Sequence, residues 1–122
     1  MNPVILEHYK HPRRHGALAA PTVRRRDVNP FCGDEVTIDL LLANGRIEDA
    51  GFDGRGCSLS LAAASILLDN VTGRPIDAVR RMSSDDMLAL LDMEIGPIRR
   101  KCALLPFSVL QACLAEEKNG HE

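Results

Sequence analysis

The spacing of hydrophobic positions in the first half of the chain predicts an antiparallel β-sheet. Between residues 35 and 42, hydrophobic side chains occupy every second position, which is the spacing of a half-buried strand. The pair Asn44-Gly45 follows, and its tolerance of positive φ favours a tight hairpin turn. Residues 46–52 are predicted to return as the partner strand, and residues 22–28, which include three arginines, to form a further exposed strand.

The second half of the chain has helical spacing and helix-boundary residues. Residues 59–71 are almost wholly apolar and predict a helix buried on most sides, with Ser58 as its N-cap. The last helix is expected over residues 102–117, because Pro106 lacks an N–H and argues against a helix that begins much before Cys102. The other expected helices are residues 3–10, a short helix after Pro75, and one that begins with the capping residues Ser83-Ser84-Asp85-Asp86 and runs to about Leu91.

Length and composition restrict the class of protein. A chain of 122 residues is expected to form one domain, residues 1–122, because two domains would each be small for a self-sufficient core. Aromatic residues make up 3% of the chain and its net charge is −2, so no nucleic-acid partner is expected. The sequence contains no secretory signal and no apolar run of about 20 residues, which predicts a cytoplasmic protein with no membrane contact.

Charged residues are unevenly distributed along the chain. Residues 1–26 contain six lysines and arginines against the single acid Glu7, whereas residues 27–53 contain seven acids against Arg46. A second basic cluster, Arg99-Arg100-Lys101, precedes Cys102. Two interpretations stay open for these clusters, namely solvated faces and a docking surface for an acidic protein partner.

Three of the four cysteines lie at boundaries between predicted elements. Cys32 lies before the alternating strand, Cys57 lies before the buried helix, and Cys102 lies where the last helix is expected to begin. A helix N-terminus stabilises a thiolate, and Lys101 adds positive charge beside Cys102. If the loops converge, the three thiolates and the Asp34 carboxylate make a four-ligand site for zinc or an iron–sulfur cluster.

The alternative is that these cysteines are buried and inert. The intervals of 24 and 44 residues between successive cysteines match no short-spacing zinc motif. Glycine and proline flank the cysteines, however, and packing seldom requires cysteine in such loops. Cys113 is expected to be a core residue, because it lies about 16 Å along the helix from Cys102 and cannot reach the same metal.

Three blocks of sequence carry a resemblance to a known family. Asn29-Pro30-Phe31-Cys32-Gly33-Asp34, Gly54-Arg55-Gly56-Cys57-Ser58-Leu59-Ser60 and Arg100-Lys101-Cys102-Ala103-Leu104-Leu105 resemble the signature blocks of the IscU/NifU/SufU iron–sulfur scaffold family. The N-terminal segment, residues 8–16, is also similar to that family's opening.

The resemblance implies an α+β fold, with a three-stranded antiparallel sheet and helices packed over one face. It implies a surface site of Cys32, Asp34, Cys57 and Cys102 that binds a [2Fe–2S] cluster, with Zn²⁺ in the same site of purified protein. The implied partners are a cysteine desulfurase, which supplies sulfur, and apo iron–sulfur proteins, which receive the cluster. A carboxylate holds such a metal more weakly than a thiolate, so Asp34 is expected to keep the cluster labile.

The chain departs from the family's subgroups at several positions. Lys101 stands before the third cysteine, as in the SufU type, whereas the IscU type has histidine there. The chain is too short between Cys57 and Cys102 for the insertion of the SufU type. Residues 95–99 replace the segment by which IscU-type proteins engage an Hsp70 chaperone, which puts chaperone-driven transfer in doubt. A histidine ligand is also in doubt, because all four histidines lie away from the three blocks, at His8, His11, His15 and His121.

Three functions are compatible with these residues. The leading hypothesis is an assembly scaffold rather than an enzyme, with Cys102 as the first persulfide acceptor beside a thiolate-stabilising Lys101; Cys32 stays possible as the acceptor. The alternative is a zinc-dependent sulfurtransferase that serves a cysteine desulfurase. The third is a structural zinc module. It is disfavoured because ligands on loops, one of them a carboxylate, are poorly suited to holding a metal permanently.

Overall fold

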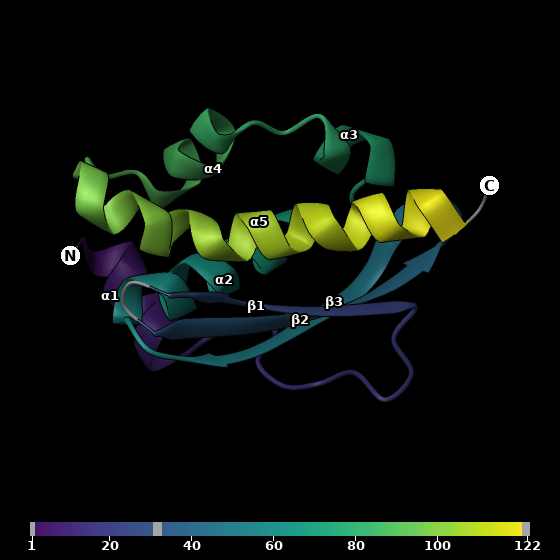
Figure 1. Cartoon of the computed structure of the whole chain (residues 1–122), viewed down its shortest axis with the longest axis horizontal. Coiled ribbons are helices and arrows are strands. Elements are labelled where there is room, and N and C mark those ends of the chain that lie inside the picture. The colour runs from purple at the N-terminus through teal and green to yellow at the C-terminus, as the bar shows by residue number, and fades with distance from the viewer. Residues whose placement is uncertain (1, 31–32, 121–122) are drawn as a thin grey trace.

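The structure is a computed structural model that describes residues 2–30 and 33–120, with side chains described as far as residue 115. Along the chain, one described helix precedes the three strands of a single sheet and the other described helices follow them (Figure 1). The elements in chain order are α1 (Pro3–Lys10), β1 (Val23–Asn29), β2 (Asp34–Ala43), β3 (Arg46–Arg55), α2 (Ser58–Val71), α3 (Ile76–Arg80), α4 (Ser84–Leu91) and α5 (Pro97–Gly120).

The sheet has the order β1-β2-β3, and both neighbouring pairs are antiparallel. Asn44 and Gly45 form the hairpin turn with φ of 57° and 72°, as their sequence predicts. β3 extends three residues beyond the predicted end at Phe52, because Asp53, Gly54 and Arg55 continue the pairing with the start of β2. The strand β1 is confirmed one residue later than expected. The predicted sheet is thus present, with longer strands.

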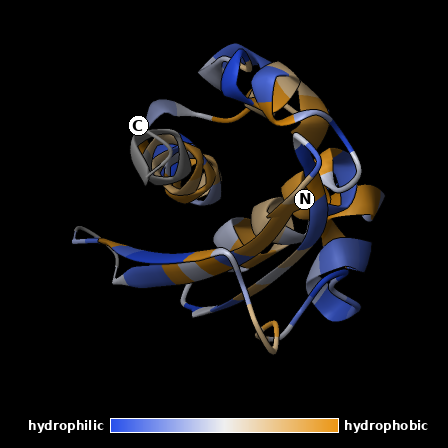
Figure 2. Ribbon diagram, turned by 90° about the vertical axis from the view of Figure 1, so that its right-hand side faces the viewer, coloured by the Kyte–Doolittle hydropathy of each residue, from blue (hydrophilic) through white to orange (hydrophobic). Residues whose placement is uncertain are grey.

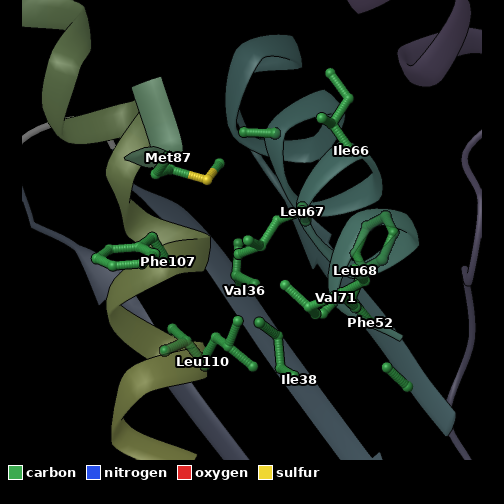
Figure 3. Close-up of a cluster of buried hydrophobic side chains, with 14 of the residues drawn as sticks. Val36, Ile38, Phe52, Ile66, Leu67, Leu68, Val71, Met87, Phe107 and Leu110 are labelled. Carbon is green, nitrogen blue, oxygen red and sulfur yellow. The ribbon is translucent and has the colours of Figure 1, made fainter. Parts of the chain in front are cut away.

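Alternation along β2 separates a buried face from a polar one. Val36, Ile38 and Leu40 are fully buried, and Figure 3 shows Val36 and Ile38 between side chains of α2 and α5. Figure 2, which views α5 nearly end-on, shows the helices on one side of the sheet. The α+β class with helices over one face is therefore confirmed.

The connection between α1 and β1 crosses the other face of the sheet (Figure 2). It begins at the edge of β3, where the Gly16 N–H donates to the Phe52 carbonyl at 2.8 Å. It then reaches β2, where the Leu18 N–H donates to an Asp39 carboxylate oxygen at 3.0 Å. Asp39 is consequently 2% exposed, although it lies on the polar face.

The capping residues of α1 and α4 and the burial of α2 agree with the sequence prediction. The Asn2 side chain accepts from the Ile5 N–H at 2.8 Å and caps α1, while Ser83 and Asp86 form a reciprocal capping box at α4. α2 is buried along most of its length, as its apolar sequence requires. Its N-cap is Cys57 rather than the predicted Ser58, because the helical conformation begins one residue earlier.

The predicted start of the last helix is wrong. α5 begins at Pro97, five residues before the expected position, and contains Pro106 in its interior. In a regular helix the N–H of residue 106 would donate to the carbonyl of Cys102. Proline lacks that N–H, but the Cys102 carbonyl accepts instead from the Ser60 hydroxyl of α2, at 2.8 Å. A tertiary hydrogen bond thereby replaces the missing helical one.

The basic segment near the N-terminus pairs with the acidic segment that follows it. Arg14 bonds Asp49 at 2.9 Å, Arg24 bonds Asp39 at 2.6 Å, and Glu35 pairs with both Arg26 and Arg55. Much of the uneven charge seen in the sequence is therefore balanced within the sheet. Among the residues that the structure describes, no helix is long and apolar enough to cross a membrane.

Candidate metal centre

One end of the sheet brings together a carboxylate and two thiols from three separate elements. Asp34 begins β2, Cys57 precedes α2, and Cys102 lies on α5. One ligand atom from each of them lies within 4.8 Å of the others. The convergence on which the sequence hypothesis depended is thus present for three of the four predicted ligands. The fourth, Cys32, lies outside the described residues.

The pairing of β1 with β2 positions Asp34. Asp34 is opposite Asn29 in the register, and the intervening turn is closed by a hydrogen bond from the Gly33 N–H to the Asn29 carbonyl at 2.8 Å. The carboxyl group of Asp34 is held in the interior, and the residue is 1% exposed. Cys32, which lies outside the described residues, is two residues before Asp34 in the sequence.

The start of α2 provides the donors that bind the Asp34 carboxylate. The Cys57 N–H donates to Oδ1 at 2.7 Å, and the Ser60 hydroxyl lies 2.9 Å from Oδ2. Gly56 makes this approach possible, since it has a φ of +118° and a Cβ there would lie 2.3 Å from Asp34 Oδ1. Gly56 and Ser60 are present in the family-like block, but their roles follow from geometry that the sequence alone does not give.

Cys57 is both the N-cap of α2 and a candidate metal ligand. Its Sγ accepts a hydrogen bond from the Leu59 N–H at 3.3 Å, which places the sulfur at the positive end of the α2 dipole. The residue is partly exposed. A negatively charged sulfur at this position is therefore supported by the helix.

Cys102 lies in the second turn of α5, so the prediction that it adjoins a helix N-terminus is wrong. The dipole effect falls off within the first turn and does not act strongly there. Cys102 is 8% exposed, and its sulfur lies beside Asp34 and Cys57. Its neighbour Lys101 is exposed and lines a surface groove of about 350 Å³ together with Val28 and Leu104.

Cys113, His8 and His15, which were not expected to be ligands, lie outside the group of Asp34, Cys57 and Cys102. Cys113 is fully buried among core side chains, as expected, with its sulfur 3.8 Å from the Ile38 carbonyl oxygen. His8 Nδ1 lies 2.7 Å from Ser65 Oγ, and burial, followed by the charge of Arg13, lowers the pKa of this imidazole. His15 contacts Phe52 and Asp53 on the sheet. Among the described residues, the group that could hold a metal contains no histidine.

The donor set fits a thiophilic metal. Thiolate sulfur suits zinc and iron–sulfur clusters, and zinc also accepts a carboxylate oxygen. Three donors on three elements leave further coordination positions for a fourth residue or an incoming ligand. A helix-covered sheet with such a group at one end defines an α+β metal-binding domain.

The comparisons place the chain in a particular family. The sequence pattern of the NifU-like N terminal domain matches residues 1–120, and the chain belongs to this family. One relative, the zinc-dependent sulfurtransferase SufU of Bacillus subtilis (strain 168), is 35% identical over 97% of this chain and 91% of its own length. The iron–sulfur cluster assembly scaffold protein IscU of Escherichia coli (strain K12) is 26% identical over 97% of this chain and 94% of its own.

A solved structure agrees with this membership. The N-terminal part of a nitrogen-fixing NifU-like protein from Brucella abortus superimposes with a TM-score of 0.81 at 25% identity, covering 97% of this chain and 94% of that one. The family resemblance predicted from the three sequence blocks is therefore confirmed.

Proposed function

We propose that this chain is a scaffold on which a [2Fe–2S] cluster is assembled and from which it is passed to apo-proteins. The observation that carries the proposal is the convergence of Asp34, Cys57 and Cys102, with ligand atoms within 4.8 Å. Cys32 is the proposed fourth ligand, because it lies two residues before Asp34 in the sequence. The site lies at the end of the sheet with Cys57 partly exposed, which suits a cargo that must enter and leave.

The ligand types support release as well as binding. Iron–sulfur clusters are typically held by four thiolates. Asp34 replaces one of these with a harder oxygen donor, which we infer to be the ligand that exchanges first. The Asp34 carboxylate accepts hydrogen bonds from the Cys57 N–H and the Ser60 hydroxyl, which keep it at the site while it exchanges.

Sulfur is proposed to arrive by persulfide transfer from a cysteine desulfurase. The Cys102 thiolate attacks the terminal sulfur of the desulfurase persulfide, a new S–S bond forms, and the desulfurase cysteine leaves as a thiolate. The exposed Lys101 is proposed to stabilise the negative charge during this exchange. Cys32 is the other candidate for the first acceptor.

Zinc-dependent sulfurtransfer is the second candidate function. It is favoured by the 35% identity to a relative named as such a sulfurtransferase. Bound zinc would hold the thiolates in reach of the incoming persulfide, and the residues proposed to bind it are Cys32, Asp34, Cys57 and Cys102. The alignment with this relative extends over 135 positions, more than the 122 residues of this chain. The relative therefore has residues that this chain lacks.

One experiment separates the two functions. Metal-free protein is incubated with ferrous iron, cysteine and a cysteine desulfurase under argon, while visible absorption and transfer to an apo-ferredoxin are followed. The scaffold proposal predicts cluster bands on this chain, followed by their transfer to the ferredoxin. An Hsp70 chaperone should not be required.

Two results would contradict the scaffold proposal. The absence of cluster bands, together with zinc-dependent acceleration of the desulfurase, would support sulfurtransfer. A protein that is inert in both assays but unfolds when a chelator removes its zinc would be a structural zinc module.

A further inference from the structure

The Cys102 carbonyl in α5 cannot receive the usual helical hydrogen bond from residue 106. Pro106 lies four residues later, at the position whose N–H would normally bond this carbonyl. A buried carbonyl without a donor is destabilising by an amount comparable to a lost hydrogen bond. Some other group must therefore donate to it if the turn that carries Cys102 is to keep its geometry.

The Ser60 hydroxyl is that donor. Ser60 is fully buried in the first turn of α2, and its Oγ lies 2.8 Å from the Cys102 carbonyl oxygen. The same Oγ lies 2.9 Å from Asp34 Oδ2. One hydroxyl thus joins three elements at the metal centre, namely β2 through Asp34, α2 through Ser60 itself, and α5 through Cys102.

A hydroxyl has one proton, and here two acceptors lie within reach of it. The proton is divided between the Asp34 carboxylate and the Cys102 carbonyl, so each contact affects the other. We propose that Ser60 is a positioning residue of the metal centre, which fixes the Asp34 carboxylate and the Cys102 turn relative to each other. The proposal rests on the proposed function, because it takes Asp34 and Cys102 to be metal ligands.

The geometry explains why this position should affect metal affinity. Asp34 is held at Oδ1 by the Cys57 N–H and at Oδ2 by Ser60, which together fix the plane of the carboxylate. Hydrogen bonds from such supporting residues orient metal ligands, and their loss typically costs about 10- to 100-fold in metal affinity. Without the hydroxyl, the carboxylate loses its hydrogen bond at Oδ2 and is held less firmly beside the thiols.

Ser65 offers a matched control on the same helix. It is also fully buried, and its Oγ bonds the Arg13 N–H and His8 Nδ1, both at 2.7 Å. The substitution Ser65→Ala removes the same group as Ser60→Ala, but its partners lie on α1 and the connection after it. Both variants are expected to be less stable, and only Ser60→Ala is expected to bind metal more weakly.

Pro106→Ala separates the two contacts of Ser60. Alanine restores an N–H that can bond the Cys102 carbonyl within the helix. In the Ser60→Ala background, Pro106→Ala should therefore recover stability, while the hydrogen bond to Asp34 Oδ2 stays lost. Pro106→Ala alone should leave the hydroxyl fully available to Asp34, and its zinc affinity should be at least that of the parent.

The experiment compares the parent with Ser60→Ala, Ser65→Ala, Pro106→Ala and the double variant Ser60→Ala/Pro106→Ala. Urea midpoints are measured on the metal-free chains, and zinc affinity is measured by competition with a chromophoric chelator. We expect zinc affinity at least about tenfold lower in Ser60→Ala and in the double variant. We also expect the urea midpoint of the double variant to move back toward that of the parent.

Two outcomes would overturn the positioning role and leave the proposed function intact. One is a zinc affinity of Ser60→Ala within twofold of the parent. The other is a zinc affinity that recovers fully in the double variant, which would show that the contact of Ser60 with Asp34 does not contribute to metal binding. A parent chain that binds no zinc would overturn the metal centre itself and this inference with it.

Discussion

Two buried carboxylates of the same strand, Asp34 and Asp39, have very different surroundings. They are 1% and 2% exposed and lie five residues apart on β2. Asp39 accepts from Arg24 Nε at 2.6 Å and Nη2 at 2.8 Å, as well as from a backbone N–H. The donors described at Asp34 are the Cys57 N–H and the Ser60 hydroxyl, and two thiols lie beside it.

The difference explains why one carboxylate is structural and the other is a candidate ligand. Arg24 binds both oxygens of Asp39 and neutralises its charge, so little is gained there from a metal cation. The donors described at Asp34, an amide and a hydroxyl, carry no net charge, and two thiols lie beside its carboxylate. A cation between Asp34 and the two sulfurs would be attracted by all three groups.

The largest expected effect is that of Gly56→Ala, which would destroy the Asp34 environment. The new Cβ would lie 2.3 Å from Asp34 Oδ1, at a residue with φ of +118°. We expect a loss of about 3 kcal/mol in the free energy of unfolding, together with loss of zinc binding. Urea unfolding and zinc competition measure the two effects.

Gly73→Ala is the control for this variant. Gly73 has a φ of +91° but open space around its Cα, so only backbone strain of about 1 kcal/mol is expected. Zinc binding should be unchanged. Equal effects of the two substitutions on zinc binding would show that contact with Asp34 is not the reason.

Asp39→Asn should break the structural carboxylate without affecting the metal centre. The loss of the charged bond to Arg24 is expected to cost about 2 kcal/mol, and zinc affinity should stay at that of the parent. The measurement is urea unfolding beside zinc competition. A parallel loss of zinc affinity would contradict the separation of the two carboxylates.

The pH dependence of stability gives a second test of Asp39. The hydrogen bond from Arg24 lowers the pKa of Asp39 below its ordinary value of 3.8. Because the folded pKa is the lower one, this stabilisation is present above the unfolded pKa of about 4 and is lost as the pH falls through the folded value. The urea midpoint of the parent should therefore decrease more steeply below about pH 4 than that of Asp39→Asn.

Asp34→Ala is expected to have a smaller effect on stability, of about 1 kcal/mol, because hydrogen bonds to neutral donors are lost. A cluster bound to this variant should persist longer than on the parent, since the exchangeable oxygen ligand is gone. The decay of visible absorption under argon measures its lifetime. A faster decay would contradict the role of Asp34 in release.

Cys113→Ala should have the smallest effect on the site. Cys113 is buried in the core, so the substitution should lower stability slightly and leave the metal content unchanged. Metal analysis of the purified variant tests this directly. A lost equivalent of metal would show that Cys113 is a ligand.

Local sequence patterns predicted most of the fold. Alternation in β2, the Asn44-Gly45 turn and the apolar run of α2 depend on neighbouring residues, which the sequence displays directly. The start of α5 could not be predicted in this way. The helix tolerates Pro106 because Ser60, more than 40 residues earlier, satisfies the Cys102 carbonyl, a contact that only the tertiary structure creates.

The same limit applies to the site. Sequence analysis identified Asp34, Cys57 and Cys102 through their loop contexts and a family resemblance. It did not predict that Ser60 would join two of them, nor that Asp39 would be buried beneath the connection from α1 to β1. Asp39 alternates like a solvent-facing residue on its strand, and only the path of that connection covers it.

Cobalt(II) binding tests the central claim most directly, because its visible spectrum reports both the donor atoms and the geometry. A metal centre that includes Cys57 and Cys102 predicts thiolate-to-cobalt charge-transfer bands and tetrahedral ligand-field bands in the parent. The charge-transfer bands should weaken in Cys57→Ser and in Cys102→Ser, and stay unchanged in Cys113→Ala. A parent spectrum like that of aqueous cobalt, or bands that neither serine variant weakens, would contradict the account.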